Sequence, residues 1–264
     1  ICWADTRQEL WEQFDLTTEE ERSEPKSVTF IASTIYDNQI LLKSNPQYVA
    51  NLKALATVER ERLLNGNWKI KPAAGLFFKR VQVGEMLQSV PADVDRWVRA
   101  WDLAATSEPE GGEPAYTAGV LMGKRKDGRY VIADVINVRM AANDVRQTIR
   151  HTAASDIARF KRVRVRLPQD PGQAGKEQAQ SYIKFLSGFD VCTVQESGSK
   201  ESRAEPVAAQ WQAGNFDIVI GDWNEAYLSQ LESFPMSKFK DMVDATSSAF
   251  SELEYVFSID SLIN

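Results

Sequence analysis

Four aspartates stand where carboxylates can do chemistry. Asp102 lies inside the apolar stretch VRAWDLAATS, and Asp170 ends the alternating stretch RVRVRLPQD. Asp241 and Asp244 are spaced i, i+3, which places both carboxylates on one face of a helix. Carboxylate oxygens are the ligands that hard divalent cations such as Mg²⁺ and Mn²⁺ prefer. The four residues are therefore candidate metal ligands.

Each of these residues also has a structural explanation. Asp102 alone fits a hydrogen-bonded core acid, because a buried charge needs a partner. Asp170 precedes a Pro-Gly pair and fits a turn or a helix cap. Asp241 and Asp244 fit a helix N-terminus, where the macrodipole favours acids. The set taken together, in chain order, favours a shared site.

The elements that position the acids follow from the hydropathy pattern. Strands are predicted over 97–104, 115–123, 129–138, 162–170, 190–197 and 217–221, and an earlier one over 27–34. Asp127-Gly128 predicts a hairpin between the second and third strands of the main series. Helices are predicted over 45–66, 141–160, 174–188, 202–216, 224–234 and 241–257.

This order of elements predicts a mixed α/β sheet, with three antiparallel strands first and parallel strands afterwards. Ligand sites in such sheets lie at the carboxyl ends of strands, where Asp102 and Asp170 fall. An acid in the first strand, an acid ending the fourth and a late DxxDA helix are the order found in the ribonuclease H-like nuclease fold. There, two metal ions about 3.5–4 Å apart clamp the attacking and leaving oxygens of a phosphodiester. Asp102 is the candidate bridging ligand.

The chain resembles the C-terminal part of phage terminase large subunits, the DNA-packaging motor proteins. The resemblance rests on RAWDLAAT, LPQDPGQAGK, SGSKESRAEPVAAQWQAGNF and KDMVDATSSAF. Residues 27–68 resemble the segment that joins the ATPase of this family to its nuclease. Where many relatives have a His-Asp-Asp run, this chain reads FKDMVDA, which makes Asp244 the stronger candidate and leaves Asp241 as a direct ligand or a helper.

The resemblance implies a metal-dependent endonuclease that cuts concatemeric double-stranded DNA, using two Mg²⁺ or Mn²⁺ ions held by Asp102, Asp170, Asp244 and Asp241. It implies a connecting segment over 1–95, following an ATPase domain outside this sequence, and a nuclease domain over 96–264. It also implies a portal protein and a small terminase subunit as partners, no membrane, and action in the host cell cytoplasm.

Candidate DNA contacts come from basic residues within the stretches that carry the resemblance. Lys176 follows Asp170, and Lys200 and Arg203 follow the strand at 190–197, on the same sheet end. Phosphate contacts of this kind position DNA without reading its sequence. The basic stretch RFKRVRVR is more typical of a solvated face.

The composition restricts the alternatives. The net charge is −6, and residues 1–24 alone hold eight acidic and two basic residues, so the remaining chain is balanced. One histidine and two cysteines are too few for a Cys/His zinc site. Two other hypotheses stay open: a junction resolvase or transposase-like nuclease of the same fold, and a non-catalytic module that docks DNA or the portal.

Overall fold

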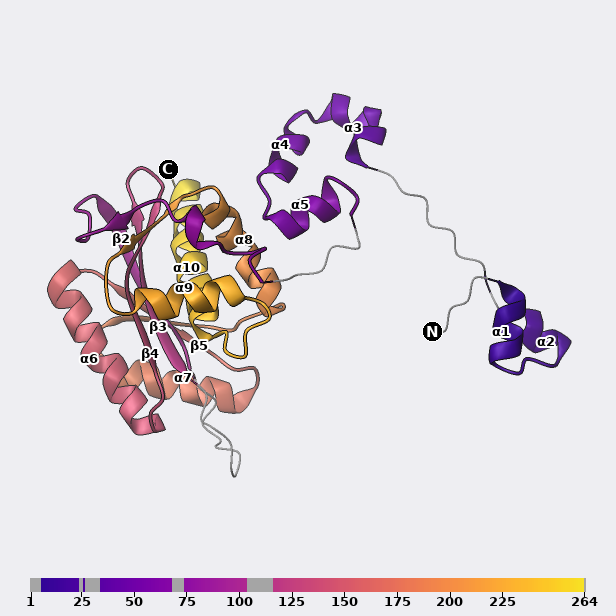
Figure 1. Ribbon diagram of the computed structural model, residues 1–264. Helices are drawn as coiled ribbons and strands as arrows, with labels where there is room; N and C mark the ends of the chain where they lie inside the picture. The colour runs from indigo at the N-terminus through magenta and orange to yellow at the C-terminus, as the bar shows by residue number, and fades with distance from the viewer. Residues whose placement is uncertain (1–5, 24–25, 27–33, 68–73, 104–115, 264) are drawn as a thin grey trace.

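The computed structural model describes residues 6–23, 26, 34–67, 74–103 and 116–263, with side chains described as far as residue 255. Its strands form a seven-stranded sheet in the order β1-β7-β4-β3-β2-β5-β6 (Figure 1). The strand bounds are β1 Met86–Leu87, β2 Val94–Asp102, β3 Thr117–Arg125, β4 Tyr130–Val138, β5 Arg164–Pro168, β6 Asp190–Val194 and β7 Phe216–Val219.

The directions of the strands confirm the predicted mixed sheet. β2, β3 and β4 are antiparallel neighbours, β5 pairs with β2 in parallel, and β6 pairs with β5 in parallel. The predicted hairpin between β3 and β4 is present: Gly128 has a φ of +88°, and the Arg129 amide donates to Asp127 Oδ1 at 2.9 Å. The two-residue strand β1 was not predicted, because two residues are too few to show an alternating pattern.

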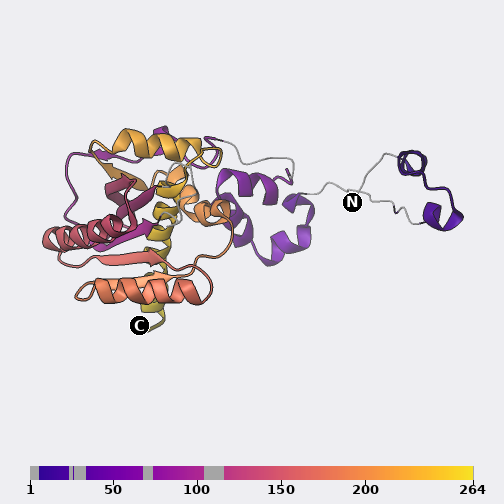
Figure 2. The same ribbon diagram turned by 90° about the horizontal axis from the view of Figure 1, so that it is seen from below.

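Helices cover both faces of this sheet. The α-helices of the described residues are α1 Arg7–Gln13, α2 Glu19–Ser23, α3 Gln39–Ser44, α4 Gln47–Lys53, α5 Thr57–Leu63, α6 Ala142–Phe160, α7 Gln173–Phe185, α8 Lys200–Gln212, α9 Asn224–Ser233 and α10 Asp241–Ile263, of which α6 to α10 pack on the sheet. Figure 2 shows α7 and α9 on opposite sides of the strands. Helices α6 and α7 share one hydrophobic cluster with the sheet, and α8, α9 and α10 share another.

Strand β2 separates these two clusters. Val98 and Ala100 pack with the α8–α10 cluster, whereas Trp101 packs with α6 and α7. Successive side chains of a strand point to opposite faces. Asp102, two residues after Ala100, therefore belongs to the face that α8 and α10 cover, and α10 packs directly on β2 and β3.

The segment before the sheet differs from the prediction in its helices, and α3 was not predicted. The single helix predicted over 45–66 is broken into α4 and α5. The Thr57 amide and its Oγ1 both donate to Gln212 Oε1 on α8, at 3.0 and 2.8 Å. Because this contact supplies the partner for the first residue of α5, the chain starts a new helix there. Residues 27–33 of the other predicted strand lie outside the described residues.

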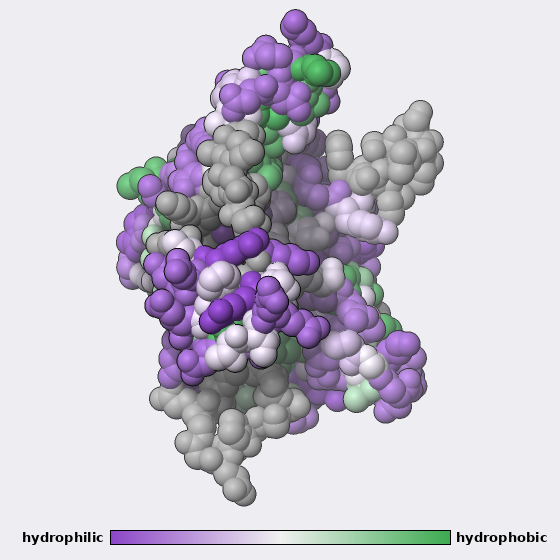
Figure 3. All heavy atoms as spheres, turned by 90° about the vertical axis from the view of Figure 1, so that its right-hand side faces the viewer, coloured by the Kyte–Doolittle hydropathy of each residue, from purple (hydrophilic) through white to green (hydrophobic). Residues whose placement is uncertain are grey.

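The surface visible in Figure 3 is hydrophilic over most of its area, with hydrophobic side chains in small separate groups. Single exposed apolar side chains, such as Ile40 and Met236, are ordinary on a folded protein. Within the described residues, the helices are all too short or too polar to cross a lipid bilayer.

Candidate active site

Asp244 is the most strongly bound of the candidate acids. It lies in the first turn of α10 and is 5% exposed. Arg203 Nη2 donates to its Oδ1 at 2.8 Å, and Lys200 Nζ donates to its Oδ2. Both cations come from the first turn of α8, which Ser199 caps through a bond from the Ser202 amide. The structure thus brings together Asp244 and two of the predicted DNA-contact residues.

Asp102 is held differently. It ends β2, where its backbone pairs with Ala118 of β3, and its carboxylate makes no hydrogen bond to a described residue. Burial raises the pKa of its carboxyl to about 7, and the negative charge of Asp244 contributes to this rise, with Asp241 adding a smaller effect. Lys200 and Arg203 act in the opposite direction. Asp102 is therefore a carboxylate whose charge the fold only partly compensates.

Asp241 completes this group of acids. Burial raises the pKa of its carboxyl, and the nearby charges of Lys200 and Arg139 lower it. Its Oδ2 is buried and finds no hydrogen-bond partner among the described residues. A buried carboxylate oxygen without a donor costs free energy unless a cation or a proton reaches it.

Asp170 and Lys176 lie at the same end of the sheet. Asp170 is exposed and follows β5 by two residues, and β5 runs parallel to β2. Gly175 lets the first turn of α7 approach this loop, since a Cβ there would clash with the Asp170 carbonyl oxygen. Asp170 is not among the charged residues that chiefly shift the pKa of Asp102. The exposed Lys176 stands in the same turn of α7.

The donor set fits a hard divalent cation better than other groups. Asp102, Asp241 and Asp244 lie within electrostatic range of one another, and Asp241 Oδ2 is buried without a hydrogen-bond partner among the described residues. In the described part of the chain, however, no group of three or more His, Cys, Asp or Glu side chains is arranged to hold a metal ion as it stands. Lys200 and Arg203 occupy the ligand oxygens of Asp244 instead.

Sequence reasoning missed a polar network behind Asp244. Glu196, two residues after β6, accepts from Arg166 Nη2 at 2.8 Å and from Ser248 Oγ at 2.9 Å. Its other oxygen lies 3.5 Å from Arg203 Nε. An acid just beyond a parallel strand was the available signal, the same one that marked Asp170.

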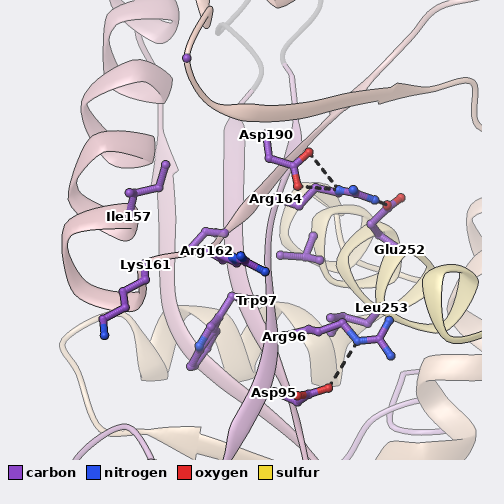
Figure 4. A pocket seen from close by; sticks show the side chains of 13 residues that line it. Asp95, Arg96, Trp97, Ile157, Lys161, Arg162, Arg164, Asp190, Glu252 and Leu253 are labelled. Atoms are coloured by element: carbon purple, nitrogen blue, oxygen red, sulfur yellow. Dashed lines mark hydrogen bonds and ion pairs between the residues drawn. The ribbon is translucent and has the colours of Figure 1, made fainter. Parts of the chain in front are cut away.

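A separate cavity of about 800 Å³ opens at the other end of the sheet (Figure 4). Its lining includes part of the basic stretch RFKRVRVR, namely Lys161, Arg162 and Arg164. Arg164 is paired there with Asp190 and Glu252, at 3.1 and 3.0 Å. These ion pairs, and the buried Arg166 at the end of the same stretch, give part of it a structural role inside the fold, which the prediction of a solvated face did not include.

Comparisons with solved structures find proteins of similar fold. The large terminase of a thermophilic bacteriophage, solved with ADP, matches with a TM-score of 0.57 and 15% identity, over 90% of this chain and 58% of that one. The large terminase nuclease of the thermophilic phage G20c, solved with magnesium, has a TM-score of 0.46 and 12% identity, over 69% and 98%. The large terminase of bacteriophage HK97 has a TM-score of 0.46 and 12% identity, over 92% and 60%.

The molecule thus has the mixed α/β architecture of the ribonuclease H-like terminase nucleases, as the sequence predicted. Residues 99–253 match the model of the terminase RNaseH-like domain, and the chain belongs to that family. It spans just over half of the ADP-bound large terminase that it matches. No curated protein sequence matches it.

Proposed function

We propose that this chain is the metal-dependent endonuclease domain of a viral DNA-packaging terminase large subunit. The observation that carries the proposal is that Asp102, Asp241 and Asp244 lie within electrostatic range of one another, and that Asp241 Oδ2 is buried without a hydrogen-bond partner among the described residues. Membership of the terminase family supports it. The substrate is concatemeric double-stranded DNA, and the reaction is phosphodiester hydrolysis.

Asp102, Asp170 and Asp244 would hold two Mg²⁺ or Mn²⁺ ions, with Asp241 as a further ligand or a helper. Such ions supply Lewis acidity and lower the pKa of water. Asp102 would bridge the pair. The carboxyl ends of β2 and β5 and the first turn of α10 are rigid elements, which keep the carboxylates in position.

The chain's own cations would position the substrate. Lys176, Lys200 and Arg203 would contact DNA phosphates, which fixes the strand at the acids without reading bases. We place the nuclease domain at 96–264 and the connecting segment at 1–95, after an ATPase domain. Buried Ala56, Val58, Phe77 and Phe78 of this segment pack in the core that α8 and α10 share. In the infected cell, the portal and the small terminase subunit would be partners in the host cytoplasm.

A plasmid assay tests the proposal. We expect the wild-type chain with Mn²⁺ to convert supercoiled plasmid to open circle and then to linear DNA, equally with and without ATP at equal free metal. A chelator should stop the reaction. Asp102→Asn should lower the rate by about 100-fold or more, because a neutral amide bridges metal ions poorly.

The matched control is Asp95→Asn, an exposed aspartate at the other end of β2. It should cut at the wild-type rate. Cleavage by Asp102→Asn at the wild-type rate would remove Asp102 from the site. A wild-type chain that binds no divalent ion and leaves the plasmid intact would support a non-catalytic docking module instead.

A further inference from the structure

The two cations that bind Asp244 are anchored very differently. The guanidinium of Arg203 binds Asp244 through Nη2 and donates to the Gly198 carbonyl through Nη1 at 3.2 Å. Its side chain is 21% exposed. The Lys200 ammonium has one ion pair in the described part of the chain, with Asp244, and its side chain is 45% exposed.

Arg203 is also held from behind by Glu196. That carboxylate is itself fixed by Arg166, which is 4% exposed, and by the hydroxyl of Ser248. Ser248 lies one turn after Asp244 on α10, so the same helix face carries both ends of the network. Arg203 therefore lies between two carboxylates, joined to Asp244 by a hydrogen bond of 2.8 Å and to Glu196 by an ion pair of 3.5 Å.

Lys200 has the opposite character. Its charge acts on Asp102 and Asp241 as well as on Asp244, so the ammonium lies within electrostatic range of all three acids. A lysine is a point charge on a flexible stem, and nothing except Asp244 fixes its position among the described residues. The ammonium neutralises part of the negative charge of the three acids, and breaking its single ion pair with Asp244 costs little free energy.

We propose that Lys200 is the resident counter-cation of the acid cluster and leaves Asp244 when a divalent cation binds. Arg203 stays in place through Glu196 and keeps Asp244 oriented. The inference rests on the proposed function, because it presupposes a metal site at these acids. The released ammonium then becomes available for the phosphate contact proposed above, which couples metal entry to substrate binding.

Titration of Mn²⁺ into the metal-free protein, without DNA, tests this exchange by calorimetry. Lys200→Met keeps most of the apolar stem and removes the charge. We expect it to bind Mn²⁺ at least about fivefold more tightly than the wild type, because no ion pair must break first. Lys184→Met, on the exposed side of α7, is the matched control and should bind as the wild type does.

Two further variants separate this exchange from a merely structural role. Lys200→Gln should repeat the gain in affinity, and circular dichroism should show both variants folded. Glu196→Gln should weaken Mn²⁺ binding, since Arg203 loses its anchor. In chelator, Lys200→Met should melt at a lower temperature than the wild type, and saturating Mn²⁺ should reverse that order.

The outcomes distinguish the inference from the function on which it rests. Mn²⁺ binding by the wild type with unchanged or weaker binding by both Lys200 variants would overturn the inference and leave the nuclease proposal standing. A wild-type chain that binds no Mn²⁺ at all would overturn both.

Discussion

Replacing Asp102 by asparagine should stabilise the metal-free protein at alkaline pH. In the fold, burial and the charge of Asp244 raise the pKa of this carboxyl from 3.8 to about 7. Between these two pH values the folded state keeps a proton that the unfolded chain has lost. The free energy of unfolding therefore falls as the pH rises through this window, and the full cost is present above pH 7.

The size of this pKa shift sets the expected change in the free energy of unfolding. Three pKa units correspond to about 4 kcal/mol, which is the largest gain that removal of the charge can bring. Water that enters beside the half-exposed Lys200 relieves part of the cost, so we expect Asp102→Asn to gain about 2 kcal/mol at pH 8. At pH 5 the gain in stability should shrink to about a third, because pH 5 lies only about a third of the way from the unfolded pKa to the folded pKa of Asp102.

Urea denaturation in chelator at pH 8 and pH 5 measures this difference. Asp95→Asn is the control, since that side chain is 60% exposed and should give no pH-dependent gain. The interpretation of Asp102 as an uncompensated charge would be wrong if asparagine destabilised the protein at pH 8. It would also be wrong if the gain were the same at both pH values.

Two other substitutions test how the site is positioned. Gly175→Ala should destabilise the fold by about 2–3 kcal/mol, because the new Cβ would meet the Asp170 carbonyl oxygen. Thermal unfolding measures this loss of stability. The control, Gln178→Ala on the exposed side of α7, should leave the stability unchanged. An alanine variant as stable as the wild type would show that the loop of Asp170 can move. Arg99→Met should cost about 3–5 kcal/mol in urea denaturation, because it leaves the buried Asp156 unpaired. The double variant with Asp156→Leu should recover most of that loss, and failure to do so would mean that Asp134 carries the pair.

The sheet was predictable because its signals are local. Short, nearly continuous apolar stretches and one Asp-Gly turn predicted β2, β3 and β4 with their directions. The break between α4 and α5 was not predictable. It depends on Gln212, which lies 155 residues from Thr57 in the sequence. Only the folded chain brings that amide to the helix start.

Less can be said of the site. The sequence predicted that Asp102, Asp170 and Asp244 form one cluster with Asp241 beside it. The charges of Asp102, Asp241 and Asp244 act on one another, whereas the place of Asp170 in the cluster stays a prediction. The roles of basic residues were harder to predict. Arg125 and Arg129, at the hairpin, serve the buried Asp217 rather than an outside partner, with Arg125 Nη1 at 2.8 Å from its Oδ2. Such pairings depend on segments far apart in the chain.

Charge compensation separates the paired core acids of this protein from the acids of the proposed site. Asp156 is 2% exposed and binds the Arg99 guanidinium through both oxygens, at 2.8 and 2.9 Å. Asp217 is fully buried and binds two arginines. Both carboxylates face a rigid cation, so their charges are compensated within the fold. Asp102 shares strand β2 with Arg99 but faces the opposite side of the sheet, where the cation that most lowers its pKa is a flexible lysine, Lys200.

This difference follows from the alternation of β2. Arg99, an odd-numbered residue, points toward α6 and meets Asp156 there. Asp102, three residues later, points toward α10, whose first turn contributes two further acids and no base. The arginine on that face, Arg203, pairs with Asp244 and leaves the Asp102 carboxylate without an ion pair among the described residues. The excess of negative charge at the end of β2 destabilises the metal-free protein, and a bound divalent cation would remove that cost. Stability in chelator and affinity for metal are therefore linked through the same carboxylates, and a substitution that improves one should weaken the other.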